Sequence, residues 1–141
     1  NFADYVNREQ KNPYDIEHIW ADDYTQGNHQ QDFSTEEEFK QFRNRFGGLL
    51  ILPKDKNRSL QDMEYSKKVI KYDSENLLAR TLNKNCYSNN PLFLRFMNET
   101  QLPFKPYDQF DKKALIERQS LYKEICKKIW DVNKIDLLAN S

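Results

Sequence analysis

Two short apolar segments constrain the fold of this chain more than any other feature. Residues 14–20 alternate in part between polar and apolar side chains, and residues 49–52 form a compact apolar run that ends at Pro53. Both segments have the length of a β-strand rather than that of a helix. The other periodic segments have helical spacing, so the sequence predicts an α+β domain that is mostly helical around a two-stranded unit.

The clearest predicted helix lies between the two strands. Ser34 and Glu37 form a capping box, and Gly47 ends the helix. Its apolar face comprises Phe39, Phe42 and Phe46. The segments between the helices are predicted to be irregular, and they comprise a polar loop (21–33), a turn (54–57) and an extended connector (102–108). Further helices are predicted at residues 59–71, 74–82, 90–97 and about 110–131.

The composition is that of one ordinary globular domain. With 141 residues, 38% of them hydrophobic and 31% charged, the chain can bury a core without disulfides or structural zinc. Cys86 and Cys126 have no CxxC partner, which indicates buried thiols in a reducing cytoplasm. No apolar run approaches the roughly 18 residues that span a membrane. We expect a domain at residues 13–132 between tails at 1–12 and 133–141, and the absence of an initial Met suggests a piece of a longer protein.

The net charge is zero, but it is unevenly distributed along the chain. Residues 1–38 carry ten acidic and two basic side chains, whereas residues 39–141 carry twelve acidic and twenty basic ones. An acidic part suits a metal ion and a basic part suits a phosphate backbone, although two solvated faces that balance each other explain the same pattern. In the basic part, Arg58, Lys67 and Lys68 are candidates for phosphate contacts.

A carboxylate next to a histidine suggests hydrolytic chemistry. His18 can act as a general base near neutral pH, while Glu17 and Asn57 offer oxygen ligands that suit Mg²⁺ or Mn²⁺. Neighbours in a strand point to opposite faces, so a shared site requires a bulge or a strand end at this position. On chemistry alone this pattern is weak, because Asn is common at turns.

The same residues resemble a known family. Residues 16–19 (Ile-Glu-His-Ile) resemble the E-H-I-x-P motif of an HNH, or His-Me finger, nuclease domain. Residues 47–60 resemble the block G-N-L-x-L-L-P…N-x-x-L in the C-terminal nuclease domain of GmrSD-type, modification-dependent restriction endonucleases. A lysine on the following helix and Arg118 on a late helix that ends in Ile-Trp also match, so the resemblance covers about residues 13–131.

The resemblance implies both a fold and a chemistry. The fold would be a ββα-metal finger embedded in a helical domain, with the finger core at residues 14–72 and the helical part at 73–132. The chemistry would be metal-dependent DNA endonuclease activity, with His18 as the general base and with Glu17 and Asn57 as ligands of Mg²⁺ or Mn²⁺.

Full-length relatives in this family resemble two-part phage-defence proteins. An N-terminal, nucleotide-using domain senses modified DNA and the C-terminal domain cuts, so we expect DNA, possibly modified, and such a sensor domain as partners. Two positions depart from the family pattern. Ala21 stands where the family has the proline after the His, and Gly48 stands where the family has an Asn that orients the catalytic His, partly through its backbone carbonyl. Gly48 keeps that carbonyl and lacks the side chain.

Two other interpretations remain open on the sequence. The first is a catalytically inactive HNH-like domain that binds DNA or protein, which Gly48 and the zero net charge support. The second is a small helical interaction module, in which the side chains of Glu17, His18 and Asn57 would not converge in space.

Overall fold

The computed structural model describes residues 13–131, and the predicted tails at 1–12 and 133–141 lie outside the described residues. Within the described part, short helices and one long helix surround a two-stranded sheet. The predicted α+β, mostly helical class is therefore confirmed. No helix in this part of the chain is long and apolar enough to cross a membrane.

The two predicted strands form one antiparallel sheet. Strand β1 (Tyr14–His18) pairs with β2 (Leu49–Pro53), with Glu17 opposite Leu50 at the point where β1 approaches its end. The ladder stops two residues earlier than predicted because residues 19 and 20 turn into the core, where both are buried.

The segment between the strands contains two helices. The short helix α2 (His29–Asp32) lies in the predicted loop, and α3 (Glu36–Arg43) is the predicted capped helix. Its cap is one residue later than expected, since the Thr35 side chain accepts the N–H of Glu38 at 3.2 Å. The helix ends at Arg43 rather than at Gly47. A turn of 3₁₀-helix, η1 (Phe46–Gly48), then leads into β2, and Phe46 is exposed there instead of lying on the apolar face of the helix.

The segment after β2 differs from the prediction. The expected turn at 54–57 is the first part of helix α4 (Lys54–Leu60), which starts directly after Pro53. The single helix predicted at 59–71 is instead divided between α4 and α5 (Tyr65–Tyr72). Proline before the first helical residue lacks an N–H and has a fixed φ, so a run that is typical of a turn can also begin a helix.

The last predicted helices form close to their expected positions. Asn76 caps α6 (Leu77–Arg80), and Asn90 caps α7 (Pro91–Thr100) by accepting the N–H of Phe93. Between them lies a 3₁₀ turn, η2 (Lys84–Tyr87).

The longest helix, α8 (Lys112–Ile129), is capped by Asp111 and lies within two residues of its predicted ends. Helical spacing predicts an inner face that includes Leu115, Leu121, Cys126, Ile129 and Trp130. This prediction is correct in the first half, where Leu115 and Leu121 are buried. The prediction fails in the second half, where Cys126, Ile129 and Trp130 are exposed. Cys126 is thus not the buried thiol that was expected, whereas Cys86 is.

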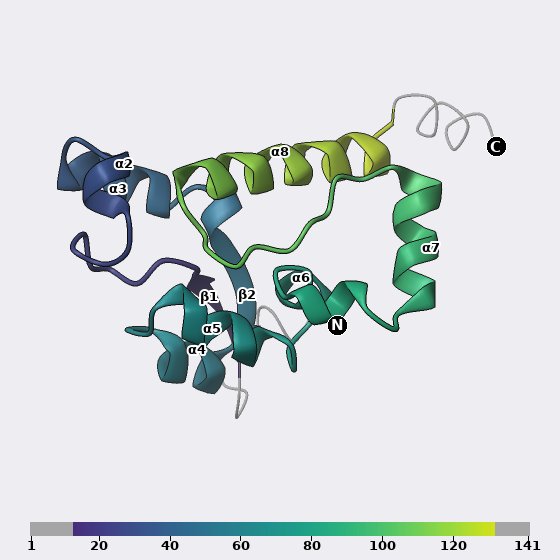
Figure 1. Ribbon diagram of the computed structural model, residues 1–141, viewed down its shortest axis with the longest axis horizontal. Helices are drawn as coiled ribbons and strands as arrows, with labels where there is room; N and C mark the ends of the chain where they lie inside the picture. Colours follow the sequence, from purple (N-terminus) through teal and green to yellow (C-terminus); the bar gives the residue numbers. More distant parts are fainter. Residues whose placement is uncertain (1–12, 132–141) are drawn as a thin grey trace.

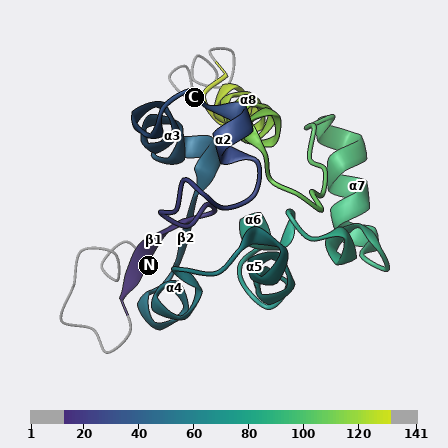
Figure 2. The same cartoon turned by 60° about the vertical axis from the view of Figure 1, so that its left-hand side comes forward.

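One continuous core joins both halves of the domain (Figure 1). Helix α8 lies along one side, α4 and α5 lie on the opposite side, and the strands lie between them, as the rotated view in Figure 2 also shows. Helices α2 and α3 form one end of the molecule and α7 the other. The buried core residues are Ile19, Trp20, Phe33, Phe39, Leu50, Leu52, Leu60, Tyr72, Ala79, Leu82, Phe110, Ala114 and Leu115.

Candidate functional site

His18 is the last residue of β1, and its imidazole lies at the solvent-accessible surface. Its Nε2 lies 2.8 Å from Oδ1 of Asn44, the residue that ends α3. The neighbouring Arg43 ties the same helix end to β1, because its Nε donates to the Trp20 carbonyl at 2.9 Å. Partial burial lowers the pKa of His18, and the bond to Asn44 opposes this effect, so the ring is neutral at pH 7 and can accept a proton.

Glu17 points into the core rather than to the surface. Its carboxylate is 1% exposed and accepts hydrogen bonds from Lys68 Nζ at 3.2 Å and from the Tyr72 hydroxyl at 2.9 Å. Burial raises the pKa of Glu17 and lowers that of Lys68, and the contact between the two charges opposes both shifts. Lys68 also donates to the His18 carbonyl at 2.7 Å, so it ties α5 to the end of β1.

Asn57 lies on α4 next to β1. Its Nδ2 donates to the Asp15 carboxylate at 3.2 Å, and Asp15 is exposed at the surface. The side chains of the half-buried Asn57 and the exposed Asp15 are therefore adjacent, and each carries an oxygen. Both are hard oxygen donors of the kind that Mg²⁺ and Mn²⁺ prefer.

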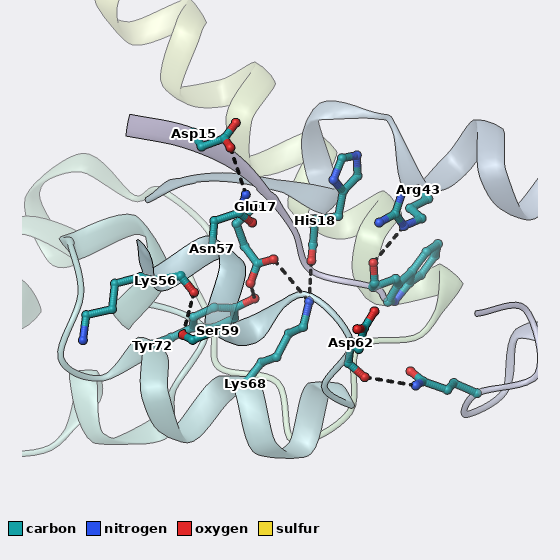
Figure 3. Close-up of polar contacts among 12 residues, drawn as sticks. Asp15, Glu17, His18, Arg43, Lys56, Asn57, Ser59, Asp62, Lys68 and Tyr72 are labelled. Atoms are coloured by element: carbon teal, nitrogen blue, oxygen red, sulfur yellow. Dashed lines mark hydrogen bonds and ion pairs between the residues drawn. The ribbon is translucent and has the colours of Figure 1, made fainter. Parts of the chain in front are cut away.

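The structure does not bring the three predicted site residues into one cleft. β1 pairs regularly through His18 without a bulge, so Glu17 and His18 project from opposite faces. Figure 3 shows the ring of His18 on one side of β1 and the carboxylate of Glu17 on the other, above Lys68 and Tyr72. Asn57 contacts Asp15 rather than either of the other two predicted residues.

Gly48 holds the backbone at the start of β2. Its carbonyl accepts the N–H of Ile19 at 2.9 Å, whereas the His18 ring bonds to the Asn44 side chain. The Gly48 carbonyl was predicted to orient the His18 ring. The hydrogen bonds of the described residues do not show this contact. A Cβ at position 48 would lie 3.0 Å from Leu115 Cδ1 and 3.2 Å from the Arg43 carbonyl oxygen, so a larger residue would be crowded.

The predicted phosphate-binding residues divide into two groups. Arg58 on α4 and Lys67 on α5 are exposed, so both can contact a phosphate backbone. Lys68 is fully buried against Glu17, and its ammonium has no path to a phosphate. Lys68 is therefore not placed to bind phosphate, contrary to the prediction. Adjacent positions on a helix lie about 100° apart, so Lys67 can face solvent while Lys68 faces the core.

Several residues that shape this region were missed by the sequence analysis. Asn44 and Asp15 are short polar side chains, and neither belongs to a periodic pattern. Tyr72 falls on the inner face of α5, four residues after Lys68, and that spacing could have paired the two side chains. Arg118, which the family resemblance singled out, is buried and donates to the Leu78 carbonyl at 2.6 Å, so it links α8 to α6.

One cavity in the described part of the chain lies apart from these residues. It has a volume of about 270 Å³, and the buried His29 lines it together with Trp20 and Phe110. None of the predicted site residues lines this cavity. His18 is instead half-buried at the surface.

A comparison with protein families assigns the chain to a family. Residues 1–125 match the family described as GmrSD restriction endonucleases, C-terminal domain. The chain belongs to this family. The family resemblance drawn from the sequence motifs is thus confirmed, and a restriction endonuclease family implies a nuclease module that acts on DNA. No curated protein and no solved structure matches the chain.

Proposed function

We propose that this GmrSD C-terminal domain is a metal-dependent DNA endonuclease of the HNH type with His18 as its general base. The observation that carries the proposal is the placement of His18. Its ring is half-buried at the surface, is held at one nitrogen by Asn44, and has a pKa that burial lowers. A neutral imidazole at the operating pH is what a general base requires.

The residues around Asn57 fit a divalent cation. Mg²⁺ commonly keeps several waters and uses one or two carboxylates, and Asn57 with the adjacent Asp15 offers two oxygen donors at the surface. Glu17, the other predicted ligand, would have to exchange its contact with Lys68 or Tyr72 to join them. A bound Mg²⁺ or Mn²⁺ would stabilise negative charge on the phosphate and the leaving oxygen.

The arrangement of elements supports a ββα-metal finger. Strand β2 is followed directly by α4, which carries Asn57 and Arg58, and α4 packs against both β1 and β2. Arg58 on α4 and Lys67 on α5 are exposed, and we assign them to phosphate contacts. This chain would be the cleavage module of a larger cytoplasmic phage-defence protein, whose N-terminal, nucleotide-using domain senses modified DNA.

Cleavage of supercoiled plasmid by the purified chain with Mg²⁺ or Mn²⁺ tests the proposal. We expect His18→Ala to reduce the rate at least a hundredfold, because a positioned general base contributes about that much or more. EDTA should abolish cleavage, and Asn57→Ala should raise the metal concentration required. Ile16→Ala, on the same exposed face of β1, is the matched control and should cut at the wild-type rate.

Equal cutting by wild type and His18→Ala would overturn the assignment of the base. A catalytically inactive domain is the second candidate, and one observation favours it, since both oxygens of Glu17 are already bonded to Lys68 and Tyr72. In that case the wild-type chain would bind DNA in a gel-shift assay but would not cut it with either metal.

A further inference from the structure

Asn44 makes two hydrogen bonds that together fix the orientation of its amide. Its Nδ2 donates to the Lys40 carbonyl at 3.0 Å, one turn back along α3. Its Oδ1 faces Nε2 of His18 at 2.8 Å. If the amide were rotated by 180°, Oδ1 would face the Lys40 carbonyl, and two acceptors would then oppose each other.

This orientation decides which nitrogen of His18 carries the hydrogen. An amide oxygen can only accept, so Nε2 must be the donor in the contact with Asn44. In a neutral imidazole the other nitrogen, Nδ1, then holds the lone pair. The tautomer thus follows from the Lys40 contact.

The backbone around Asn44 is itself held in place. Arg43 anchors the end of α3 to the Trp20 carbonyl at 2.9 Å, two residues beyond His18 on the same segment. The Asn44 N–H bonds to the Phe42 carbonyl, which closes the helix end. The two residues that end α3 therefore both hold the segment that leaves β1, one through the main chain and one through the imidazole.

From these contacts we infer that Asn44 is the positioning residue for His18, and that Nδ1 of His18 is the atom that accepts the proton. The inference rests on the proposed nuclease function. Gly48 has no side chain and its carbonyl is bonded to Ile19, so Asn44 supplies an amide at the ring from a position four residues earlier.

The chemical step then balances as follows. An O–H bond of water breaks, its oxygen bonds to phosphorus, and Nδ1 of His18 takes the proton. The P–O bond to the leaving oxygen breaks, and that oxygen takes a proton from solvent. The resulting imidazolium still donates from Nε2 to Asn44, so the contact that orients the base also stabilises its charged form.

Nitrogen-15 NMR of the full chain tests the tautomer without reference to activity. The chain has two histidines, so the spectrum of His18→Ala assigns the His18 signals. At a pH where His18 is neutral, we expect the wild type to show mainly the Nε2–H form. Asn44→Ala should give a mixture of tautomers, and Asn44→Asp, which keeps an acceptor, should restore the Nε2–H form.

Plasmid cleavage by the same variants tests the consequence for catalysis. Asn44→Ala should lower kcat about tenfold, which is the size of one net hydrogen bond, and should leave KM for DNA unchanged. Asn44→Asp should recover most of the rate. Gln41→Ala, an exposed change on the same helix, is the control for α3 and should match the wild type.

The outcomes separate this inference from the proposed function. A wild-type chain that does not cut contradicts the nuclease proposal, whereas the NMR result decides whether Asn44 sets the tautomer of His18. An Nδ1–H tautomer in the wild type would overturn the inference, as would an Asn44→Ala spectrum identical to that of the wild type. A changed tautomer with unchanged kcat would also overturn it.

Discussion

A buried lysine neutralises a buried carboxylate at the centre of this domain. Lys68 is 0% exposed and Glu17 is 1% exposed, and the Nζ–Oε1 distance between them is 3.2 Å. The Tyr72 hydroxyl also donates to Glu17, and Lys68 also donates to the His18 carbonyl. A buried ion pair of this kind adds little net stability over a well-packed apolar pair, but loss of one partner leaves an uncompensated charge in the core.

We predict that Lys68→Met lowers the free energy of unfolding by about 3 kcal/mol, because Glu17 would then remain buried without its cation. Urea titration followed by circular dichroism measures this loss. Lys67→Met, at the exposed neighbouring position, should change stability by less than about 0.5 kcal/mol. The double variant Glu17→Gln/Lys68→Met should regain part of the loss, and a double variant less stable than Lys68→Met would contradict the pairing.

Single residues were predicted from the sequence with mixed success. The chemical types at Glu17, His18 and Asn57 were recognised, but the direction of each side chain was not. In β1 the period of two separates neighbours, so Glu17 and His18 could share a motif without sharing a face. Asn44 contacts His18 from 26 residues away, and no local pattern marks such a contact.

At the scale of elements, the contact between η1 and α8 connects the two halves of the domain. The Gly47 N–H donates to the Gln119 side-chain oxygen at 2.6 Å. A methyl group at Gly47 would collide with the Leu115 carbonyl oxygen and would lie 2.9 Å from the Gln119 backbone nitrogen. Backbone atoms of α8 cannot move aside as a flexible side chain can, so Gly47 is required by close approach rather than by its own φ.

We predict that Gly47→Ala destabilises the domain by about 2 kcal/mol, in the range found for overpacked positions. Gly48→Ala should cost less, because its nearest contact is the movable Leu115 side chain at 3.0 Å. Thermal unfolding of both variants measures the difference. Equal melting temperatures for the two would mean that α8 can shift away from η1.

Elements were easier to predict than their contacts. The strands, the Asn90 cap and the long helix follow from periodicity and capping chemistry, which act within a few residues. The boundary between α4 and α5 and the exposed end of α8 depend on which surfaces other elements cover. Trp130 is apolar and falls at helical spacing, yet it is 69% exposed. Periodicity predicts which residues share a face of the helix, but not whether another element covers that face.

At the scale of the whole molecule, a buried histidine couples stability to pH. His29 is 7% exposed and packs its ring 4.4 Å from that of Phe39 and 4.8 Å from that of Trp20. Burial lowers the pKa of His29 below its ordinary value of about 6.5, and Asp32 and Asp23 oppose this shift. The unfolded chain therefore binds the proton more readily than the folded chain does.

We predict that the domain loses stability as the pH falls from about 7 through 6.5 towards the folded pKa of His29. The contribution of His29 is complete above the unfolded pKa and is lost on acidification, because the unfolded state binds more protons in that range. His29→Phe keeps an aromatic ring and should flatten the urea midpoint between pH 7 and 5. The remaining slope would come from other groups with shifted pKa values, which include His18 and, in the opposite sense, Glu17. An unchanged slope in His29→Phe would contradict the assignment.

The close approach of α8 to η1 also limits how this nuclease unit can be reused. Residues 14–72 contain both strands, α4 and α5, so they are the shortest continuous segment with every part of the predicted finger. A segment that ends at residue 72 lacks α8, and therefore lacks Leu115, which packs against Gly47 and Gly48. The start of β2 would then be exposed to solvent. The shortest transplantable unit therefore extends through α8, and engineered fusions are better joined outside residues 13–131.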